Sequence, residues 1–389
     1  MLFIPEKIEY ILNTLESNGF EAYLVGGCVR DMLSGKVPQD FDITTSALPS
    51  EVIKIFPKTV PTGIKHGTVT VINGGASAEV TTYRSDGEYK DSRRPESVSF
   101  VGSLKEDLAR RDFTVNAMAY NKDGVKDFFG GTEDLKAGIL RAVGDPETRF
   151  TEDALRVLRL FRFAAVLGFT PEKATLAAAL HCAPLLKNIS AERINAELTK
   201  ALSGKNPAAL APLTDCGGLA FLGIRGTPDY QKVKKLNINA GLAVFAFLYS
   251  AGADIPAVLD KLKFPNKSKD LAERLLFLFE KPFPETKPQI KEMLFRSSED
   301  IFRAYLKLNA VFFGRNTAPA EAMLSEILEN REPYRTGDLK IGGGELLKLG
   351  IRGERIGQTL EVLRRSVCER PQLNTSSRLT EKAKELNRN

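Results

Sequence analysis

The stretch LVGGCVRDMLSGKVPQDFDITTS, which runs from Leu24 to Ser46, decides the fold of this protein. Residues 21–25 predict a short buried strand, which leads directly into Gly26 and Gly27 and then into a short helix over residues 28–33. Two glycines at this point allow backbone N–H groups to approach a phosphate closely. The helix N-terminus adds partial positive charge, so the stretch predicts a phosphate-binding turn.

Two aspartates, Asp40 and Asp42, follow this helix on a segment that predicts a second strand. Alternate residues of a strand face the same side, so the two carboxylates are expected to converge. Convergent carboxylates suit Mg²⁺, which keeps several waters and takes further ligands from phosphates. Arg30, on the preceding helix, is placed to neutralise a triphosphate. The pattern therefore predicts a magnesium site able to support an in-line phosphoryl displacement.

The composition is that of an ordinary globular protein, with 389 residues, 43% of them hydrophobic and 27% charged. This length predicts about two or three domains. No apolar run reaches the roughly 18 residues of a membrane span, and the first residues turn polar too soon for a secretory signal. The four cysteines are widely separated and the chain has two histidines, which disfavours disulfides and zinc sites. We expect a cytoplasmic protein whose metal ligands are carboxylates.

The predicted secondary structure changes near residue 150, from mixed strands and helices to helices alone. Residues 67–72 and 78–83 alternate in the manner of strands, and strands mix with short helices up to about residue 145. Thr151 then predicts the N-cap of a helix over residues 152–167. Further helices are predicted over residues 175–187, 191–202, 241–249, 269–279, 299–313 and 320–329. The expected fold class is α+β, with a mixed head and an all-helical remainder.

Four motifs in residues 20–170 jointly resemble those of class II tRNA nucleotidyltransferases, the CCA-adding enzymes and their poly(A) polymerase relatives of the polymerase-β superfamily. The first is the glycine pair with Arg30 and the aspartate pair. The others are the stretch from Glu79 to Phe100, an RRDFTVNA motif over residues 110–117, and an EDALR motif over residues 152–156. Residues 346–363 also resemble a C-terminal stretch of the shorter bacterial enzymes, with Glu354 and Arg355 in place of an expected Pro-Trp pair.

The resemblance implies a polymerase-β-type catalytic head over residues 1–145, with a mixed β-sheet and helices. It implies an all-α neck, body and tail over residues 146–215, 216–310 and 311–389. The implied reaction is the addition of CCA to the 3′ end of tRNA from CTP and ATP with Mg²⁺, in which Asp40 and Asp42 are catalytic and hold the metal.

The EDALR motif can be interpreted chemically. Asp153 and Arg156 are three residues apart, which on one helix makes them neighbours. A carboxylate accepts hydrogen bonds and a guanidinium donates them, whereas cytosine and adenine both present an amine beside a ring nitrogen acceptor. Guanine and uracil present a carbonyl and a ring N–H instead. Asp153 and Arg156 are therefore expected to favour C and A, and the resemblance assigns them the same role. Arg159 is expected to reach the nucleotide, and Arg162 either the nucleotide or an acidic residue of the head.

The resemblance implies further site residues. It implies that Arg111 contacts the triphosphate or stacks on the base, and that Asp112 and Asn116 act near the ribose or orient a loop. Glu79, on a strand expected beside the one with the aspartate pair, is a candidate third carboxylate in a supporting role, and Glu152 is expected to support the base-recognition motif. The loop over residues 86–94 is implied to assist the change from C to A addition, and its presence argues against a CC-only enzyme.

Charge is unevenly distributed along the chain. The net charge is +6, yet the first 150 residues hold 18 Lys and Arg against 22 Asp and Glu. The basic helical remainder is expected to bind the tRNA acceptor stem and TΨC arm through phosphates and shape, with no membrane or protein partner implied.

Three alternatives remain open from sequence. The nearest is an A-only tRNA nucleotidyltransferase or a poly(A) polymerase on the same scaffold. The others are a catalytically silent RNA-binding protein and a nucleotidyltransferase for small acceptors.

Overall fold

The computed structural model describes residues 2–86, 89–90, 94–95, 98–236 and 239–388. The chain divides into two compact units, which are taken separately below. The first comprises Met1–Tyr230, Ser250–Ala253 and Lys261–Lys263, and the second comprises Gln231–Tyr249, Asp254–Asp260 and Phe264–Asn389. Much of the loop expected over residues 86–94 falls on residues 87–88 and 91–93, outside the described residues.

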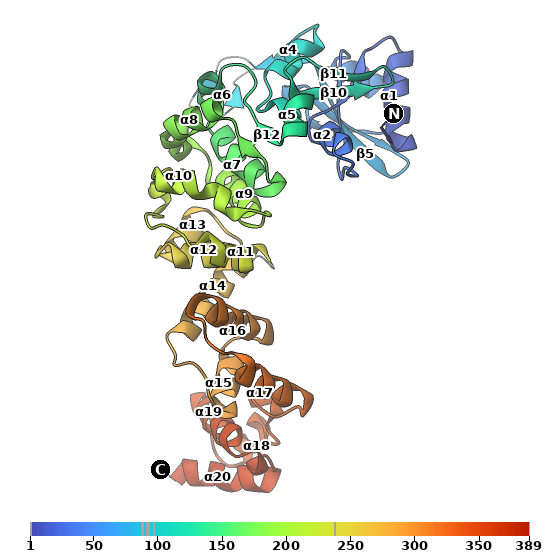
Figure 1. The fold of residues 1–389 in the computed structure, drawn as a ribbon. Helices are drawn as coiled ribbons and strands as arrows, with labels where there is room; N and C mark the ends of the chain where they lie inside the picture. The colour runs from blue at the N-terminus through green and yellow to red at the C-terminus, as the bar shows by residue number, and fades with distance from the viewer. Residues whose placement is uncertain (1, 87–88, 91–93, 96–97, 237–238, 389) are drawn as a thin grey trace. The chain divides into compact units, whose positions relative to one another are not determined.

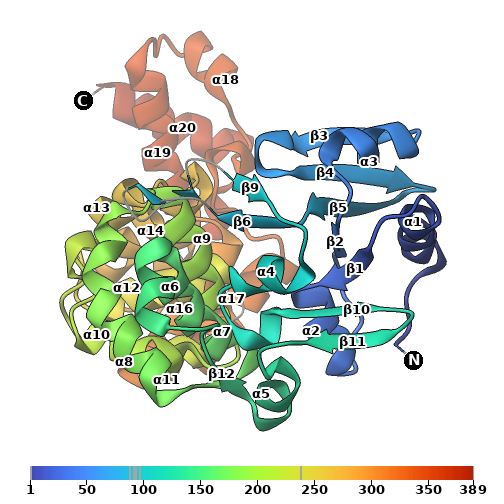
Figure 2. The same ribbon diagram turned by 90° about the horizontal axis from the view of Figure 1, so that it is seen from above.

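The first unit opens with the mixed sheet that the sequence predicted. Within the described residues seven strands lie in the order β11-β10-β1-β2-β5-β4-β3, which Figure 2 shows from above. All neighbours in this sheet are antiparallel except β2 and β5, which are parallel. The strands are β1 (Ala22–Val25), β2 (Asp42–Thr45), β3 (Thr59–Gly63), β4 (Thr68–Asn73), β5 (Ala76–Thr82), β10 (Met118–Asn121) and β11 (Gly124–Asp127). Shorter strands are β6 (Arg84–Asp86), β7 (Tyr89–Lys90), β8 (Arg94–Pro95), β9 (Val98–Phe100) and β12 (Ile139–Leu140), the last pairing with β13 (Thr170–Pro171).

Helices bury both faces of this sheet. Side chains of α1 (Glu6–Ser17), α2 (Gly27–Leu33) and α3 (Pro49–Ile55) share one apolar cluster with β1, β2, β4 and β5. Side chains of α4 (Leu104–Ala109) belong to a second cluster with β1 and β10. The helix α5 (Gly131–Ala137) packs beside the 3₁₀ turn Thr114–Asn116. Burial on both faces fixes the sheet, and with it the end of β2 that carries Asp42.

The rest of the first unit is helical. Its longest helices, α7 and α9, pack against each other (Figure 1). The helices are α6 (Pro146–Glu152), α7 (Leu155–Leu167), α8 (Lys173–Cys182), α9 (Ala191–Leu202) and α10 (Ala211–Asp215), with 3₁₀ segments at Ala183–Asn188, Pro207–Leu210 and Ala220–Leu222.

The predicted helix over residues 152–167 is wrong at its start. Thr151 lies inside α6, whose N-cap is Asp145 with Pro146 at the first helical position. The Asp145 side chain accepts a hydrogen bond from the backbone N–H of Thr148 at 2.8 Å. Aspartate followed by proline is a stronger helix start than a threonine, because the proline needs no N–H partner there. The chain then leaves the helix at Asp153, with φ −133° and ψ 100°, before α7 begins.

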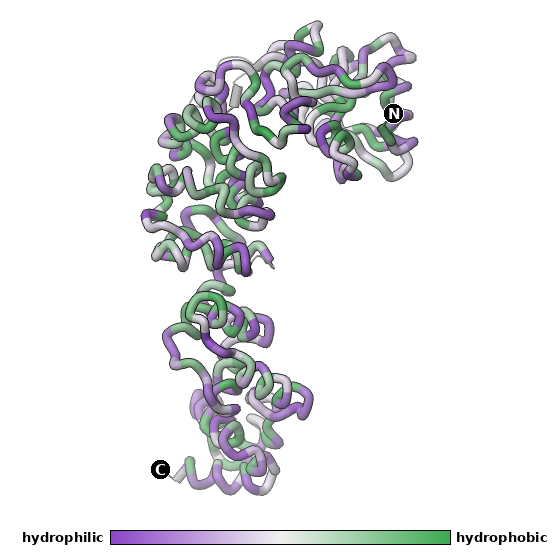
Figure 3. The backbone as a smooth tube through the Cα atoms, viewed as in Figure 1, coloured by the Kyte–Doolittle hydropathy of each residue, from purple (hydrophilic) through white to green (hydrophobic). Residues whose placement is uncertain are grey.

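The second unit is built from helices that carry hydrophobic and hydrophilic residues side by side (Figure 3). They are α11 (Tyr230–Lys235), α12 (Ala240–Ser250), α13 (Ile255–Lys261), α14 (Asn266–Phe279), α15 (Lys287–Arg296), α16 (Glu299–Phe313), α17 (Ala318–Glu329), α18 (Gly343–Lys348), α19 (Glu354–Glu369) and α20 (Ser376–Arg388). One terminal residue each of α11, α12 and α13 belongs to the first unit. The predicted helices over residues 191–202 and 299–313 match α9 and α16 at both ends, and the other predicted helices lie on α8, α12, α14 and α17.

Residues 339–383 form a buried cluster of their own within this unit. The division into neck, body and tail stays a prediction. Among the described residues, no helix is long and apolar enough to cross a membrane.

Candidate active site

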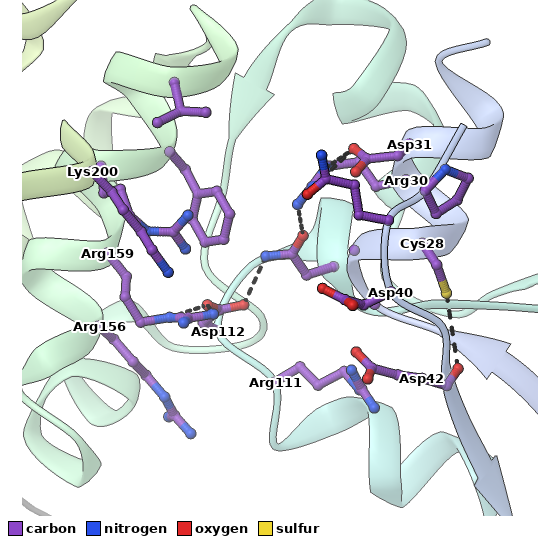
Figure 4. A pocket seen from close by; sticks show the side chains of 18 of the residues that line it. Cys28, Arg30, Asp31, Asp40, Asp42, Arg111, Asp112, Arg156, Arg159 and Lys200 are labelled. Carbon is purple, nitrogen blue, oxygen red and sulfur yellow. Dashed lines mark hydrogen bonds and ion pairs between the residues drawn. The ribbon is translucent and has the colours of Figure 1, made fainter. Parts of the chain in front are cut away.

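One cavity of about 1000 Å³ in the first unit gathers most of the predicted site residues. Figure 4 shows the aspartates Asp40 and Asp42 on one side, Arg156 and Arg159 on the other, and Asp112 between them. Of the residues predicted from sequence, its lining includes Gly26, Gly27, Arg30, Asp40, Asp42, Arg111, Asp112, Asn116, Asp153, Arg156, Arg159 and Arg162. Glu79 and Glu152 are not among the lining residues, but Glu79 is in register with Asp42 and Glu152 bonds directly to Arg156.

The two aspartates face the cavity from the start of β2. Asp40 lies in the bend before the strand and Asp42 is its first residue. Glu79, on β5, is the registered partner of Asp42, so the predicted placement of Glu79 beside the aspartate pair is confirmed. Although Asp42 opens onto the cavity, desolvation by the surrounding protein raises its pKa, Arg111 opposes this, and Glu79 and Asp40 raise it further.

The glycine turn lies against the same aspartates. Gly26 is the N-cap of α2 and has φ +75°, a left-handed conformation that favours glycine. A Cβ atom at this position would lie 3.0 Å from Nη1 of Arg111 and 3.9 Å from a carboxylate oxygen of Asp42. The missing side chain therefore lets Arg111 and Asp42 approach the turn. Arg111 also lies 3.6 Å from Asp107, while its buried Nε has no hydrogen-bond partner among the described residues.

The carboxylates of Asp40 and Asp42 suit a hard divalent cation, one that prefers oxygen ligands. The aspartate pair offers carboxylate oxygens only. Burial is the main reason that the pKa of Asp42 is raised, the charges of Glu79 and Asp40 raise it further, and a bound cation would oppose both effects. No group of three His, Cys, Asp or Glu side chains able to hold a metal occurs among the residues that the structure describes. Two carboxylates are an incomplete set, as expected where the nucleotide phosphates supply the other ligands.

A chain of hydrogen bonds connects several of the residues that line the cavity. Arg30 forms an ion pair with Asp31 at 2.8 Å and donates from Nη1 to the side-chain oxygen of Asn116 at 2.7 Å. Asn116 in turn donates to Asp112 at 3.1 Å, and Arg159 donates to the other oxygen of Asp112 at 2.8 Å. The positive charge of Arg30, which we expected to face a triphosphate, is thus partly neutralised by Asp31. Asn116 and Asp112 connect Arg30 to Arg159 of α7.

The interactions of Asp112 with Arg159 and Asn116 are expected to stabilise the folded protein in a pH-dependent way. Burial alone would raise the pKa of Asp112, but the Arg159 charge and the hydrogen bonds from Asn116 and Arg159 lower it to about 2. Because the folded-state pKa lies below the unfolded value, the stabilisation is present above about pH 4 and is lost as the pH falls towards 2. We expect Asp112→Asn to lower the stability at pH 7 by on the order of 2 kcal/mol, with a gap from the parent protein that narrows below about pH 4.

Thermal unfolding followed by circular dichroism from pH 7 down to pH 3 measures this gap. The exposed Asp123 gives a matched control, Asp123→Asn, that should follow the parent protein. A gap that stays constant or widens towards pH 3 would contradict the assigned pairing.

The base-recognition motif differs from the sequence expectation in one respect. Asp153 and Arg156 do not share a helix face, because Asp153 lies in the break between α6 and α7. Both side chains still line the cavity. Asp153 is instead paired with Arg193 of α9, with Nη2 to Oδ2 at 2.7 Å.

Arg156 is buried and tied to the protein on several sides. Its Nη1 donates to Glu152 at 2.6 Å and to the backbone oxygen of Arg149 at 3.0 Å. Its Nη2 donates to the backbone oxygen of Arg110 at 2.8 Å. Glu152 therefore bonds directly to Arg156 and helps to fix its guanidinium at the cavity wall, while the supporting role of Glu152 stays a prediction.

The two remaining arginines of α7 pair with carboxylates. Arg159 forms an ion pair with Asp112 at 2.6 Å and lies 4.0 Å from Glu197. Arg162 pairs with Glu197 of α9 and lies over the Phe163 ring at 3.7 Å from its centroid. The acidic partner of Arg162 therefore comes from α9, and the expected partner in the head is wrong. The reason is the close packing of α7 on α9.

Sequence reasoning missed a set of residues on α9. Arg193, Glu197 and Lys200 recur at steps of four and three, which places them on one helix face. Arg193 and Lys200 line the cavity, and Glu197 pairs with two of its arginines. The periodic charges were visible in the sequence, but nothing there showed which face meets the site.

Two family models match the chain. The "Poly A polymerase head domain" matches residues 22–141, and the "Probable RNA and SrmB- binding site of polymerase A" matches residues 168–222. The first range contains the aspartate pair and the glycine turn. The second contains α9, which carries the residues that sequence reasoning missed.

Full-length relatives share a common name. The chain is 40% identical to a CCA-adding enzyme of Limosilactobacillus fermentum, over 98% of this chain and 97% of that protein. It is 39% identical to a CCA-adding enzyme of Geobacillus kaustophilus, over 97% and 96%. A crystal structure of the Bacillus stearothermophilus CCA-adding enzyme in complex with CTP superposes with a TM-score of 0.83 at 34% identity, over 99% of this chain and 98% of that one. A Thermotoga maritima CCA-adding enzyme complexed with tRNA shares the fold, with a TM-score of 0.67 at 23% identity, over 98% and 96%.

Proposed function

The chain belongs to the family of CCA-adding enzymes, and from this premise we propose how it adds CCA to the 3′ end of tRNA from CTP and ATP. The observation that supports the mechanism is a single cavity. It presents the aspartate pair and the glycine turn opposite the base-recognition arginines, so that a triphosphate and its base can be held at once. Members of this family depend on a divalent metal, and the all-oxygen donor set favours Mg²⁺.

In this proposal Asp40 and Asp42 would hold the metal against the triphosphate. When bound, Mg²⁺ neutralises charge on the phosphates and lowers the pKa of the attacking hydroxyl. The N–H of Gly26 donates to the backbone oxygen of Met118, so the backbone N–H groups at the N-terminus of α2 from Gly27 onward would receive phosphate oxygens. Arg111, beside both the turn and Asp42, adds positive charge at the same place. The terminal ribose hydroxyl of tRNA then attacks the α-phosphate, and pyrophosphate leaves.

Nucleotide choice is proposed to lie on the opposite wall. Asp153 accepts a hydrogen bond from the exocyclic amine that C and A share, and Arg156 donates one to the adjacent ring nitrogen. Uracil and guanine would place a carbonyl against the carboxylate and an N–H against the guanidinium, which leaves buried polar groups unpaired. Arg159 and Arg162, held by Asp112 and Glu197, complete this wall.

The helical remainder of the chain is proposed to bind the tRNA, and the protein is proposed to act in the cytoplasm. The basic helical neck, body and tail would bind the tRNA acceptor stem and TΨC arm through their phosphates. The four cysteines are unpaired, which supports work in the reducing cytoplasm. The names of the full-length relatives do not favour the A-only or poly(A) alternative.

Incubation of the protein with Mg²⁺ and tRNA that lacks CCA, with each labelled nucleotide in turn, tests the proposal. We expect CTP alone to add two residues, CTP with ATP to complete CCA, and UTP or GTP to be incorporated at least about tenfold less efficiently. A homopolymer from ATP alone would support a poly(A) polymerase instead. Equal use of all four nucleotides would contradict the proposed base recognition.

A further inference from the structure

The carboxylate of Asp153 is held by a residue from another helix. Asp153 lies between α6 and α7, where its side chain is not constrained by a neighbouring turn of helix. Its Oδ1 accepts the backbone N–H of Leu155 at 3.1 Å and Nη1 of Arg193 at 3.3 Å. Its Oδ2 accepts Nη2 of Arg193 at 2.7 Å. The guanidinium of Arg193 thus holds both oxygens at once.

This arrangement leaves a defined acceptor position on Asp153. A carboxylate has about four lone-pair sites, two on each oxygen. Among the described residues, the bonds to Leu155 and Arg193 occupy both sites of Oδ1 and one of Oδ2. The remaining site belongs to Oδ2, which makes the shorter bond to Arg193.

We propose that Arg193 is a positioning residue for nucleotide choice, which holds Asp153 as a fixed hydrogen-bond acceptor against the base. The proposal rests on the base-recognition role proposed for Asp153. An amine of cytosine or adenine then meets the open site of Oδ2. A carbonyl of uracil or guanine meets an electron-rich oxygen that cannot turn away, and this mismatch is what excludes it.

The wider geometry of α9 supports the assignment. Glu197, one turn after Arg193, pairs with Arg159 and Arg162 of α7. One face of α9 therefore holds both Asp153 and the arginines that follow it. The planar fork of arginine matches a carboxylate bidentately, which a lysine cannot do. Without the fork, Asp153 can rotate and a water can bridge it to a uracil carbonyl, so discrimination falls.

The test is the ratio of kcat/KM for CTP to kcat/KM for UTP on tRNA that lacks CCA. We expect Arg193→Met to lower this ratio about tenfold. Arg193→Lys should lower it less, because the ammonium keeps the charge but not the fork. A merely structural role for Arg193 would reduce both rates alike and leave the ratio unchanged, which would overturn the proposal. If Arg193→Met does not fold, an unchanged ratio in Arg193→Lys overturns it equally.

A double-mutant cycle separates this inference from the function on which it rests. If Arg193 acts through Asp153, adding Arg193→Met to Asp153→Ala leaves the ratio of the single Asp153 variant unchanged. If Asp153→Ala itself keeps the parent ratio, base recognition by Asp153 is wrong, and the role of Arg193 falls with it. If Asp153→Ala lowers the ratio but neither Arg193 variant does, only the positioning role is wrong.

A matched control lies next to Arg193 on the same helix. Glu192 pairs with Lys263 at 2.6 Å, and its side chain is 58% exposed and outside the cavity lining. Glu192→Gln also weakens an ion pair of α9, but away from the site. It should keep the parent ratio, and a loss as large as that of Arg193→Met would assign the effect to α9 as a whole and overturn the proposal.

Discussion

Asp42→Asn should lower kcat for CTP addition by on the order of a thousandfold or more, while tRNA binding stays close to that of the parent protein. Asparagine keeps the size of the side chain but removes the negative charge that a divalent cation needs. Asp42 lies at the start of a strand packed on both faces, so the loss should come from chemistry and not from unfolding. Steady-state rates with saturating CTP and a tRNA gel-shift titration measure the two quantities.

The control for this variant is Asp123→Asn, which removes the same charge from an exposed turn away from the cavity. It should retain the parent rate. A rate for Asp42→Asn within about tenfold of the parent would be too small a loss for a metal ligand and would refute that role.

Asp153→Ala should reduce the preference for CTP over UTP by about ten- to a hundredfold, the effect of losing one hydrogen bond to a charged group. The rate with CTP should fall, because the amine of cytosine loses its acceptor. The rate with UTP should fall less or rise, because the carbonyl no longer faces a carboxylate. Single-nucleotide incorporation at several concentrations of each nucleotide gives the two values of kcat/KM.

Arg156→Ala is the companion variant, since its guanidinium would serve the adjacent ring nitrogen of the same bases. This variant should also reduce the ratio of kcat/KM for CTP to kcat/KM for UTP. Its contacts to Glu152, Arg149 and Arg110 make it more costly to stability, so the Asp153 variant is the more decisive. A CTP to UTP ratio that survives both substitutions would show that another part of the cavity selects the base.

The convergence of the glycine turn and the aspartate pair was predictable because these residues are close together in the sequence. Gly26, Gly27, Asp40 and Asp42 fall within 17 residues of one another, so a strand, a turn and a second strand suffice to converge them. The place of Glu79 beside Asp42 was also expected, because two alternating strands of the same domain tend to pair.

The start of α6 after Asp145 was not predictable from the sequence in the same way. Asp and Thr both cap helices, and the prediction rested on Thr151 alone. The structure selects Asp145 and breaks the helix at Asp153, which frees that carboxylate from helical geometry. Asp153 and Arg156 still line one cavity, so the chemistry expected of them stays a prediction with both side chains on the same site.

The class of fold and the convergence of the glycine turn with the aspartate pair could be predicted from the sequence alone, because both depend on spacing within short segments. How Asp153, Arg159 and Arg162 are held depends on the tertiary structure. Arg193 lies 40 residues from Asp153, and Glu197 lies 35 residues from Arg162. Ion pairs between helices depend on which faces pack together, and that is set by the burial of apolar surface over the whole unit.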